Sequence, residues 1–148
     1  MNARGFTLLE LLVVIAIIGL VLAVIPGFLI RDQPALELER AARQVGDGLR
    51  QTRSDAMVSN RERVFAIDVE ARTFRPGQGH PLQQLEPGLE VGLLTARGEL
   101  MNAQQGRIRF FPDGSSTGGR ITLQQGGLGA AVAVDWLTGM VTIDGPGA

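Results

Sequence analysis

The sequence predicts an α+β protein in which a long N-terminal helix packs on a domain of antiparallel β-sheet. Residues 6–30 are almost continuously apolar, which indicates a helix of membrane length. Residues 38–56 repeat apolar side chains at steps of three and four, and from residue 63 the period changes to two. With 20 glycines and no tyrosine, the composition favours a second part rich in strands and turns.

The composition also limits the kinds of site that the protein can carry. At 148 residues the chain has room for one domain of ordinary size beside the N-terminal segment. The formal net charge of −1 points to no particular charged partner. The absence of cysteine excludes a disulfide framework, a thiolate metal site and a cysteine nucleophile.

Residues 6–30 predict a transmembrane helix, since they would measure about 37 Å as a helix and a hydrocarbon core is ~30 Å thick. A five-residue leader with one charge, Arg4, precedes the run, and no small-residue cleavage site follows it, unlike an ordinary secretory signal. Glu10 does not prevent insertion. An acid at mid-membrane costs ~2.5–3.5 kcal/mol, whereas each of the many apolar residues returns ~0.3–0.6 kcal/mol.

Gly5, Phe6 and Glu10, in the string GFTLLE ahead of the apolar run, resemble the N-terminus of type IV pilins and type II secretion pseudopilins. The resemblance implies that a membrane prepilin peptidase removes the leader peptide, residues 1–5, by cleaving after Gly5. It also implies that the new N-terminal Phe6 is N-methylated. The mature chain would then assemble into a helical filament through residues 6–30.

The position of Glu10 relative to the new N-terminus has a chemical meaning. Cleavage leaves an amine at Phe6 that is positive near neutral pH, and Glu10 offers it a counter-charge in a low dielectric. The resemblance implies that the pairing is intermolecular and joins an incoming subunit to its neighbour. The alternative is that Glu10 only reaches the membrane interface near the helix end.

Pro26 and Gly27 are interpreted either as a bend used in filament packing or as a helix boundary.

Residues 31–62 predict an amphipathic continuation of the helix, which lies against the soluble domain and stops near Ser59 and Asn60. Its inward positions recur at helical spacing: Leu38, Ala42, Val45, Leu49, Thr52 and Ala56. Charges of both signs fill the remaining positions and indicate a solvated face. Gly48 is expected to weaken this helix locally.

Residues 63–148 predict a domain of antiparallel β-sheet, because its strands follow one another without crossover helices. The expected strands lie at 63–69, 73–74, 89–93, 107–111, 120–123, 131–136 and 140–143. The string PDGSSTGG, residues 112–119, is expected to join two of them as a hairpin, and residues 137–139 to close another. Residues 75–87 are expected to form a loop, and Trp136 is expected in the core.

Within this domain, IRFFPDGSSTGGRITL followed by VAVDWLTGMVTI resembles the C-terminal domain of H-type minor pseudopilins and of the related FimT-like minor pilins. The resemblance implies a pilin-like fold and a minor pseudopilin of a type II secretion system, which helps to export folded proteins across the outer membrane. Expected partners are the other pseudopilins, the prepilin peptidase/methyltransferase, the inner-membrane assembly platform and, for residues 6–30, membrane lipid. The chain is expected to cross the bacterial inner membrane once, with residues 63–148 in the periplasm, and to enter the pseudopilus.

The alternative function is that of a FimT-like minor type IV pilin, which binds DNA for uptake. The resemblance places DNA contacts of that group in a basic C-terminal tail with a Gly-Arg-x-Arg pattern, whereas residues 142–148 carry one acid and no base. A patch of Arg107, Arg109 and Arg120 keeps this alternative open. Six arginines against eight acids from residue 64 onward disfavour nucleic acid as a partner. A third interpretation is an anchored domain with an unrelated periplasmic role.

No enzyme, cofactor or metal site is expected. His80 is the only histidine and lies in a Gly/Pro loop, where a surface position is expected rather than a Ser–His–Asp arrangement. Asp113 with Ser115, Ser116 and Thr117 offers oxygen atoms to a cation. This group lacks the spaced carboxylates of a calcium loop, however, and turn chemistry explains the same residues.

Overall fold

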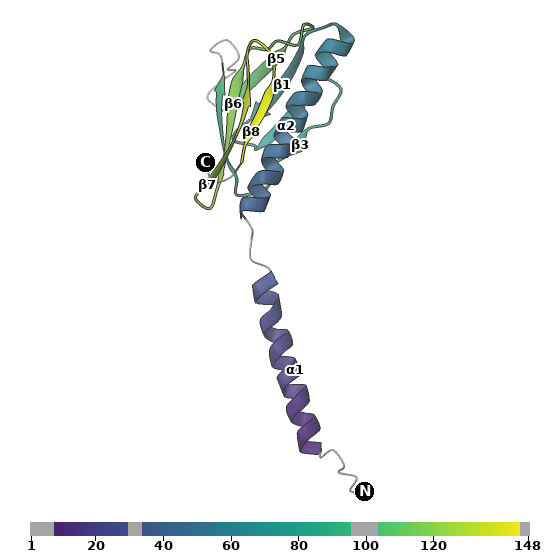
Figure 1. Ribbon diagram of the computed structural model, residues 1–148, viewed down its shortest axis with the longest axis vertical. Coiled ribbons are helices and arrows are strands. Elements are labelled where there is room, and N and C mark those ends of the chain that lie inside the picture. Colours follow the sequence, from purple (N-terminus) through teal and green to yellow (C-terminus); the bar gives the residue numbers. More distant parts are fainter. Residues whose placement is uncertain (1–7, 30–33, 96–103, 146–148) are drawn as a thin grey trace. The chain divides into compact units, whose positions relative to one another are not determined.

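The computed structural model describes residues 8–29, 34–95 and 104–145, and the side chains of the first helix over residues 8–21 (Figure 1). The chain divides into two compact units, Met1–Gln33 and Pro34–Ala148. Gly5 and Phe6, the predicted cleavage and methylation residues, lie outside the described residues.

The first unit contains helix α1, Leu8–Leu29, which is 22 residues long. Its described side chains are all exposed. The helical backbone continues through Pro26 and Gly27 to Leu29, and the predicted bend at this pair stays a prediction. Among the residues that the structure describes, no helix is both long and apolar enough to cross a membrane.

The second unit begins with helix α2, Pro34–Ser59, which has proline at its first position, where the missing N–H has no helical partner in any case. The helix stops at Ser59, as predicted, and Asn60 follows in the left-handed conformation that commonly ends helices (φ 49°). All six predicted inward positions are confirmed as buried. The buried set of α2 is Leu38, Ala41, Ala42, Val45, Gly46, Gly48, Leu49, Thr52 and Ala56.

Eight strands complete the second unit: β1 Arg63–Asp68, β2 Thr73–Pro76, β3 Gln83–Gln84, β4 Glu90–Thr95, β5 Gln105–Phe110, β6 Gly119–Gln125, β7 Leu128–Val134 and β8 Val141–Asp144. They form two four-stranded sheets, ordered β3-β2-β1-β5 and β4-β6-β7-β8. Every pairing is antiparallel, which confirms the predicted pairing of β1 with β2 and of β7 with β8. The prediction of an α+β fold is therefore correct.

Helix α2 lies along the strands of both sheets and shares one core with them (Figure 1). Phe65, Phe74 and Phe110 are fully buried there, and the rings of Phe65 and Phe74 stack with centroids 5.3 Å apart. Inward side chains of both sheets join them, including Ile121 and Val132. The hydrophobic core thus depends on α2, because the helix contributes Leu38, Val45 and Leu49 to it.

Gly48 has a packing role in addition to the local weakening of α2 that the sequence predicts. A Cβ atom at Gly48 would lie 2.9 Å from Cε2 of Phe74 and 3.1 Å from Cε2 of Phe65. The helix continues through this position, and the missing side chain lets the stacked rings approach its backbone. Glycine lowers the intrinsic stability of α2 here, but it fits the core.

The predicted hairpin across residues 112–119 is wrong. Strand β5 pairs with β1, and β6 pairs with β4 and β7, so the PDGSSTGG segment passes from one sheet to the other. A single antiparallel bridge, Phe110 to Ser116, is what remains of the expected pairing. Gly114, with a φ of 87°, lies in a tight turn that returns the chain only as far as Thr117, whose N–H donates to the carbonyl of Arg109, and Gly118 follows with a φ of 71°.

Two further strand predictions need correction. The predicted loop at residues 75–87 contains the end of β2 and the two-residue strand β3, which pairs with β2 through backbone groups. Strand β7 begins at Leu128 rather than at residue 131 and forms a hairpin with β6. Gly126 and Gly127 make its two-residue turn with positive φ angles, which is the geometry that tight hairpins favour.

Candidate functional site

Glu10 is placed in the first turn of α1 and is exposed. A carboxylate in the first turn is favoured by the partial positive charge at a helix N-terminus. The exposed side chains around and after it are mainly leucine, isoleucine and valine, so α1 carries a long apolar surface with one acidic side chain near its start. A large exposed apolar surface marks a site of interaction with a membrane or another protein.

The three arginines of the suspected DNA patch do not lie on one sheet. Arg107 and Arg109 belong to β5, and Arg120 belongs to β6. The Arg109 guanidinium contacts the Glu62 carboxylate at 3.0 Å, and that of Arg120 contacts Asp144 at 3.1 Å. Two of the three positive charges therefore have acidic partners within the domain, which weakens their attraction for phosphate.

His80 lies against α2 and does not form a Ser–His–Asp arrangement. Its Nε2 atom is 2.7 Å from Oδ2 of Asp55, and its Nδ1 atom is 3.3 Å from the side-chain amide of Gln51. These contacts hold the segment between β2 and β3 against the helix. The imidazole is partly exposed, and its described partners are structural, in agreement with the surface position predicted for it.

The polar string after β5 is a hydrogen-bonded turn. The Asp113 carboxylate accepts hydrogen bonds from the backbone N–H of Ser115 at 3.0 Å and from its hydroxyl at 2.6 Å, and these bonds lower the pKa of Asp113. The Ser116 hydroxyl does not join this group, because it donates to the carbonyl of Asp135. Turn chemistry accounts for these residues, as the sequence predicts.

The β7–β8 turn is built around Asp135. Its Oδ1 accepts hydrogen bonds from the N–H groups of Leu137 and Thr138 and from the Thr138 hydroxyl, at 3.1, 2.8 and 2.8 Å. The bonds from Thr138 contribute most to lowering the pKa of Asp135. The expectation of a core Trp136 is wrong: the residue follows the end of β7, enters this turn and is 66% exposed.

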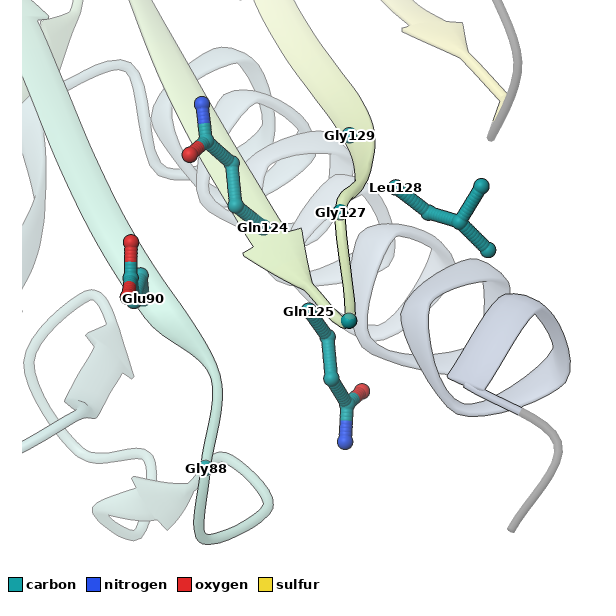
Figure 2. A pocket seen from close by; sticks show the side chains of 8 residues that line it. Gly88, Glu90, Gln124, Gln125, Gly127, Leu128 and Gly129 are labelled. Carbon is teal, nitrogen blue, oxygen red and sulfur yellow. The ribbon is translucent and has the colours of Figure 1, made fainter. Parts of the chain in front are cut away.

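A cavity of about 360 Å³ opens between the start of β4 and the β6–β7 turn (Figure 2). Glu90, Gln124 and Gln125 line it together with the glycines of the turn. Gln125 also donates from Nε2 to the carboxylate of Glu37 in α2 at 2.8 Å. The described lining offers one carboxylate and two amides, which suit hydrogen bonding and supply no nucleophile. Apart from the paired glycines at 126 and 127, no sequence pattern indicated this cavity.

Within residues 8–29, 34–95 and 104–145, no group of three or more histidine, aspartate or glutamate side chains is arranged to hold a metal ion. Asp144 pairs with an arginine, and Asp135 accepts hydrogen bonds within a turn.

Two protein-family models match the chain. The prokaryotic N-terminal methylation motif matches residues 1–26, and the model of the type II transport protein GspH matches residues 41–139. A relative, the type II secretion system protein H of Xanthomonas campestris pv. campestris, is 37% identical over 138 residues. These cover 93% of this chain and 81% of the relative.

Two solved structures share the fold. Both are of EpsH, the minor pseudopilin of the Vibrio cholerae type II secretion system, and they match with TM-scores of 0.59 and 0.60. The matches cover 76% and 77% of this chain and 99% and 97% of the other chains, at 15% and 16% sequence identity. An N-terminal helix followed by a helix on two antiparallel sheets therefore defines a pilin-like α+β protein.

The sequence relationship is more specific than this fold class. The GspH model covers most of the second unit, and the protein H relative spans nearly the whole chain. The chain belongs to the GspH family of type II transport proteins. The resemblance to H-type minor pseudopilins is thereby confirmed.

Proposed function

We propose that the chain is a minor pseudopilin that enters the pseudopilus of a type II secretion system through α1 and helps to export folded proteins across the outer membrane. The observation that carries the proposal is the match to the methylation motif over residues 1–26, ahead of a GspH domain. In this proposal the role is mechanical and not enzymatic. The contact of the His80 imidazole with Asp55, which holds a loop against α2, fits a structural role for the only histidine of the sequence.

Processing at the N-terminus prepares the chain for assembly. A prepilin peptidase cleaves between Gly5 and Phe6, and the amine of Phe6 is then methylated. The amine carries a positive charge near neutral pH. Glu10 of one subunit pairs with the Phe6 amine of its neighbour, and the low dielectric around packed apolar helices strengthens this attraction. Glu10 lies in the first turn of α1, close in sequence to the new N-terminus, and its side chain is exposed.

The apolar surface of α1 has two successive environments in this proposal. Before assembly, residues 6–30 lie in the inner membrane, with residues 63–148 in the periplasm. After extraction by the assembly platform, the same surface packs against the α1 helices of other pseudopilins. The exposed apolar side chains of α1 support both environments. Pro26 and Gly27 allow the helix to bend or loosen as it packs.

The first test concerns processing. The variant Gly5→Ala is expected to accumulate as precursor, because the residue before the cleaved bond is changed. The intact mass of the protein from membranes reports the retained five-residue leader directly. Ala3→Ser, a change of similar size within the leader, is the matched control and should be processed normally. Normal loss of the leader from Gly5→Ala would refute cleavage at this bond.

The second test concerns the charge of Glu10. Glu10→Gln preserves size and removes the charge, so membrane insertion and processing should remain while recovery in sheared pseudopili falls. Glu10→Asp, which keeps the charge on a shorter side chain, is the matched variant and should retain more assembly than Glu10→Gln. If Glu10→Gln enters pseudopili as well as the unchanged protein does, Glu10 has no pairing role and only reaches the membrane interface.

A further inference from the structure

The turn between β7 and β8 lies beside α2, at the end of the domain where the helix stops (Figure 1). A polar cleft separates the helix from this turn. It has a volume of about 270 Å³ and is lined by Arg50, Arg53, Thr138, Gly139, Met140 and Val141. The two arginines are one helical turn apart and so lie on the same side of α2. The described lining therefore contains two positive charges and no carboxylate.

Arg53 is held in a fixed orientation. Its Nε–H donates to the carbonyl of Gly114 at 3.0 Å and its Nη2 donates to the carbonyl of Thr138 at 2.9 Å. The surrounding backbone is fitted closely to the guanidinium. A Cβ atom at Gly139 would clash with the Gly114 carbonyl oxygen and would lie 2.9 Å from Nε of Arg53. Both glycines have positive φ angles, which disfavour any other residue.

These contacts leave the charge of Arg53 without a described acidic partner. A guanidinium has five N–H donors, and the two carbonyls accept from two of them. The guanidinium of Arg50 has one described acidic partner, the Asp47 carboxylate, at 2.9 Å. The Asp47 side chain is 75% exposed, so this ion pair lies in solvent. Exposed ion pairs of this kind contribute little to stability, so Arg50 can exchange this partner for another carboxylate. The cleft thus presents oriented donors that match a carboxylate in geometry and charge.

Large exposed apolar side chains lie in and beside the turn that lines the cleft. Trp136, Leu137 and Met140 are 66%, 63% and 60% exposed. The hydrogen bonds to Asp135 fix the turn that carries them, and Met140 donates from its backbone N–H to the Thr138 hydroxyl at 3.2 Å. Exposed aromatic and methionine side chains on a rigid turn are typical of binding surfaces, because little conformational freedom is lost on association.

We infer that this cleft is an interaction surface for a neighbouring pseudopilin, which inserts an aspartate or glutamate side chain carried on an apolar segment. The carboxylate would take the free donors of Arg53 and the charge of Arg50, while the apolar segment covers Trp136, Leu137 and Met140. This inference rests on the proposed function, since it requires a second subunit. It adds a contact between the folded domains to the contacts made through α1.

The acidic groups beside the cleft disfavour a polyanion as the occupant. Asp113 and Asp135 lie in the two loops that supply the carbonyls for Arg53, and their carboxylates accept hydrogen bonds from their own turns. Their negative charges oppose a run of phosphates more strongly than a single carboxylate seated on two arginines. Exposed apolar side chains beside the cleft are also poorly suited to nucleic acid, which binds surfaces with an excess of basic residues.

The test uses the full chain in membranes that contain the other pseudopilins of the system. Because the sequence has no cysteine, Leu137→Cys creates a unique attachment point for a benzophenone maleimide beside the cleft. Illumination should yield an adduct to another pseudopilin, and mass spectrometry should place it near an aspartate or glutamate. The same probe at Arg43→Cys, on α2 but outside the cleft lining, is the matched position and should give much less of this adduct.

Charge reversal then tests the arginines. Arg50→Glu in the Leu137→Cys chain should lower the adduct about tenfold, because like charges then face each other. Arg43→Glu, which reverses an exposed charge on the same helix, should leave it unchanged. Changing the acid identified in the partner to arginine should restore the adduct with Arg50→Glu.

Three results would overturn the inference: an adduct insensitive to Arg50→Glu, an adduct to lipid or nucleic acid, or no adduct from chains that are recovered in sheared pseudopili. The last result would leave the proposed function intact. Failure of the chain to enter pseudopili at all would instead refute the proposed function, and the inference with it.

Discussion

The packing of α2 predicts opposite effects for two glycines that are two residues apart. In Gly48→Ala, the new Cβ atom would lie 2.9, 3.1 and 3.3 Å from side-chain atoms of Phe74, Phe65 and Pro76. Both phenylalanine rings are fully buried and stacked, so neither can move without disturbing the other. In Gly46→Ala, the nearest atom is the terminal Cδ1 of Ile143 at 2.7 Å, on the edge strand β8.

At each position, the sign of the change in unfolding free energy depends on which of two opposing effects is larger. Replacing glycine by alanine in a helix interior is worth about 0.8–1.0 kcal/mol in favour of the folded state. Overpacking a close-packed core costs about 1–3 kcal/mol. At Gly48 the second effect wins, and we expect a net loss of about 1 kcal/mol. At Gly46 the end of the partly buried Ile143 side chain can rotate away, so we expect a small net gain.

Equilibrium urea denaturation of the purified chain in mild detergent, followed by far-ultraviolet circular dichroism, measures both variants. The difference in unfolding free energy between them should be about 1–2 kcal/mol, with Gly46→Ala the more stable. Adding Phe74→Leu to Gly48→Ala should recover part of the loss beyond additivity, since the clash is shared. Equal stability of Gly48→Ala and Gly46→Ala would refute the role assigned to Gly48.

Two further predictions concern the turns. Arg53→Met keeps an apolar stem but removes both hydrogen bonds to the loops, so the unfolding free energy should fall by about 2–3 kcal/mol; an unchanged urea midpoint would contradict the anchoring role. Turn hydrogen bonds hold the pKa of Asp68, Asp113 and Asp135 below the usual range. Because these carboxylates titrate lower in the folded than in the unfolded chain, their contribution to stability is present above about pH 4 and is lost as pH falls through the folded pKa. The urea midpoint should therefore drop on acidification, and Asp135→Asn should weaken that dependence; a midpoint that is independent of pH in the acid range would contradict this.

The sequence predicted those parts of the structure that local patterning controls. The spacing from Leu38 to Ala56 identified the buried face of α2, because a helix that covers a sheet must repeat its apolar side chains at helical spacing. Alternation located β1 and β8 in the same way. The family resemblance came from the first ten residues and the last third of the chain, and the comparisons bear it out.

Features set by long-range packing were not predictable from the same patterns. Alternation marks a strand but does not name its partner, so β5 and β6 were expected to pair although they belong to different sheets. Trp136 continued an apparent alternation, but Asp135 ends the strand by accepting hydrogen bonds from the turn. The hydrogen bonds of Arg53 join α2 to two loops that are distant in the sequence, and no local sequence pattern indicates these contacts. The paired glycines at 126 and 127 were a usable turn signal that was missed.

The strands alternate between the two sheets along the chain, and this order affects how the domain folds. Strands β1, β2 and β3 belong to one sheet, β4 to the other, β5 to the first again, and β6, β7 and β8 to the second. A chain emerging from its N-terminus therefore holds β4 without a partner until β6 has followed, and α2 keeps an uncovered side until β7 arrives. No smaller piece of the domain closes its own core. We expect partial chains to remain exposed to proteases until nearly the last strand is made, and then to become resistant in a single step.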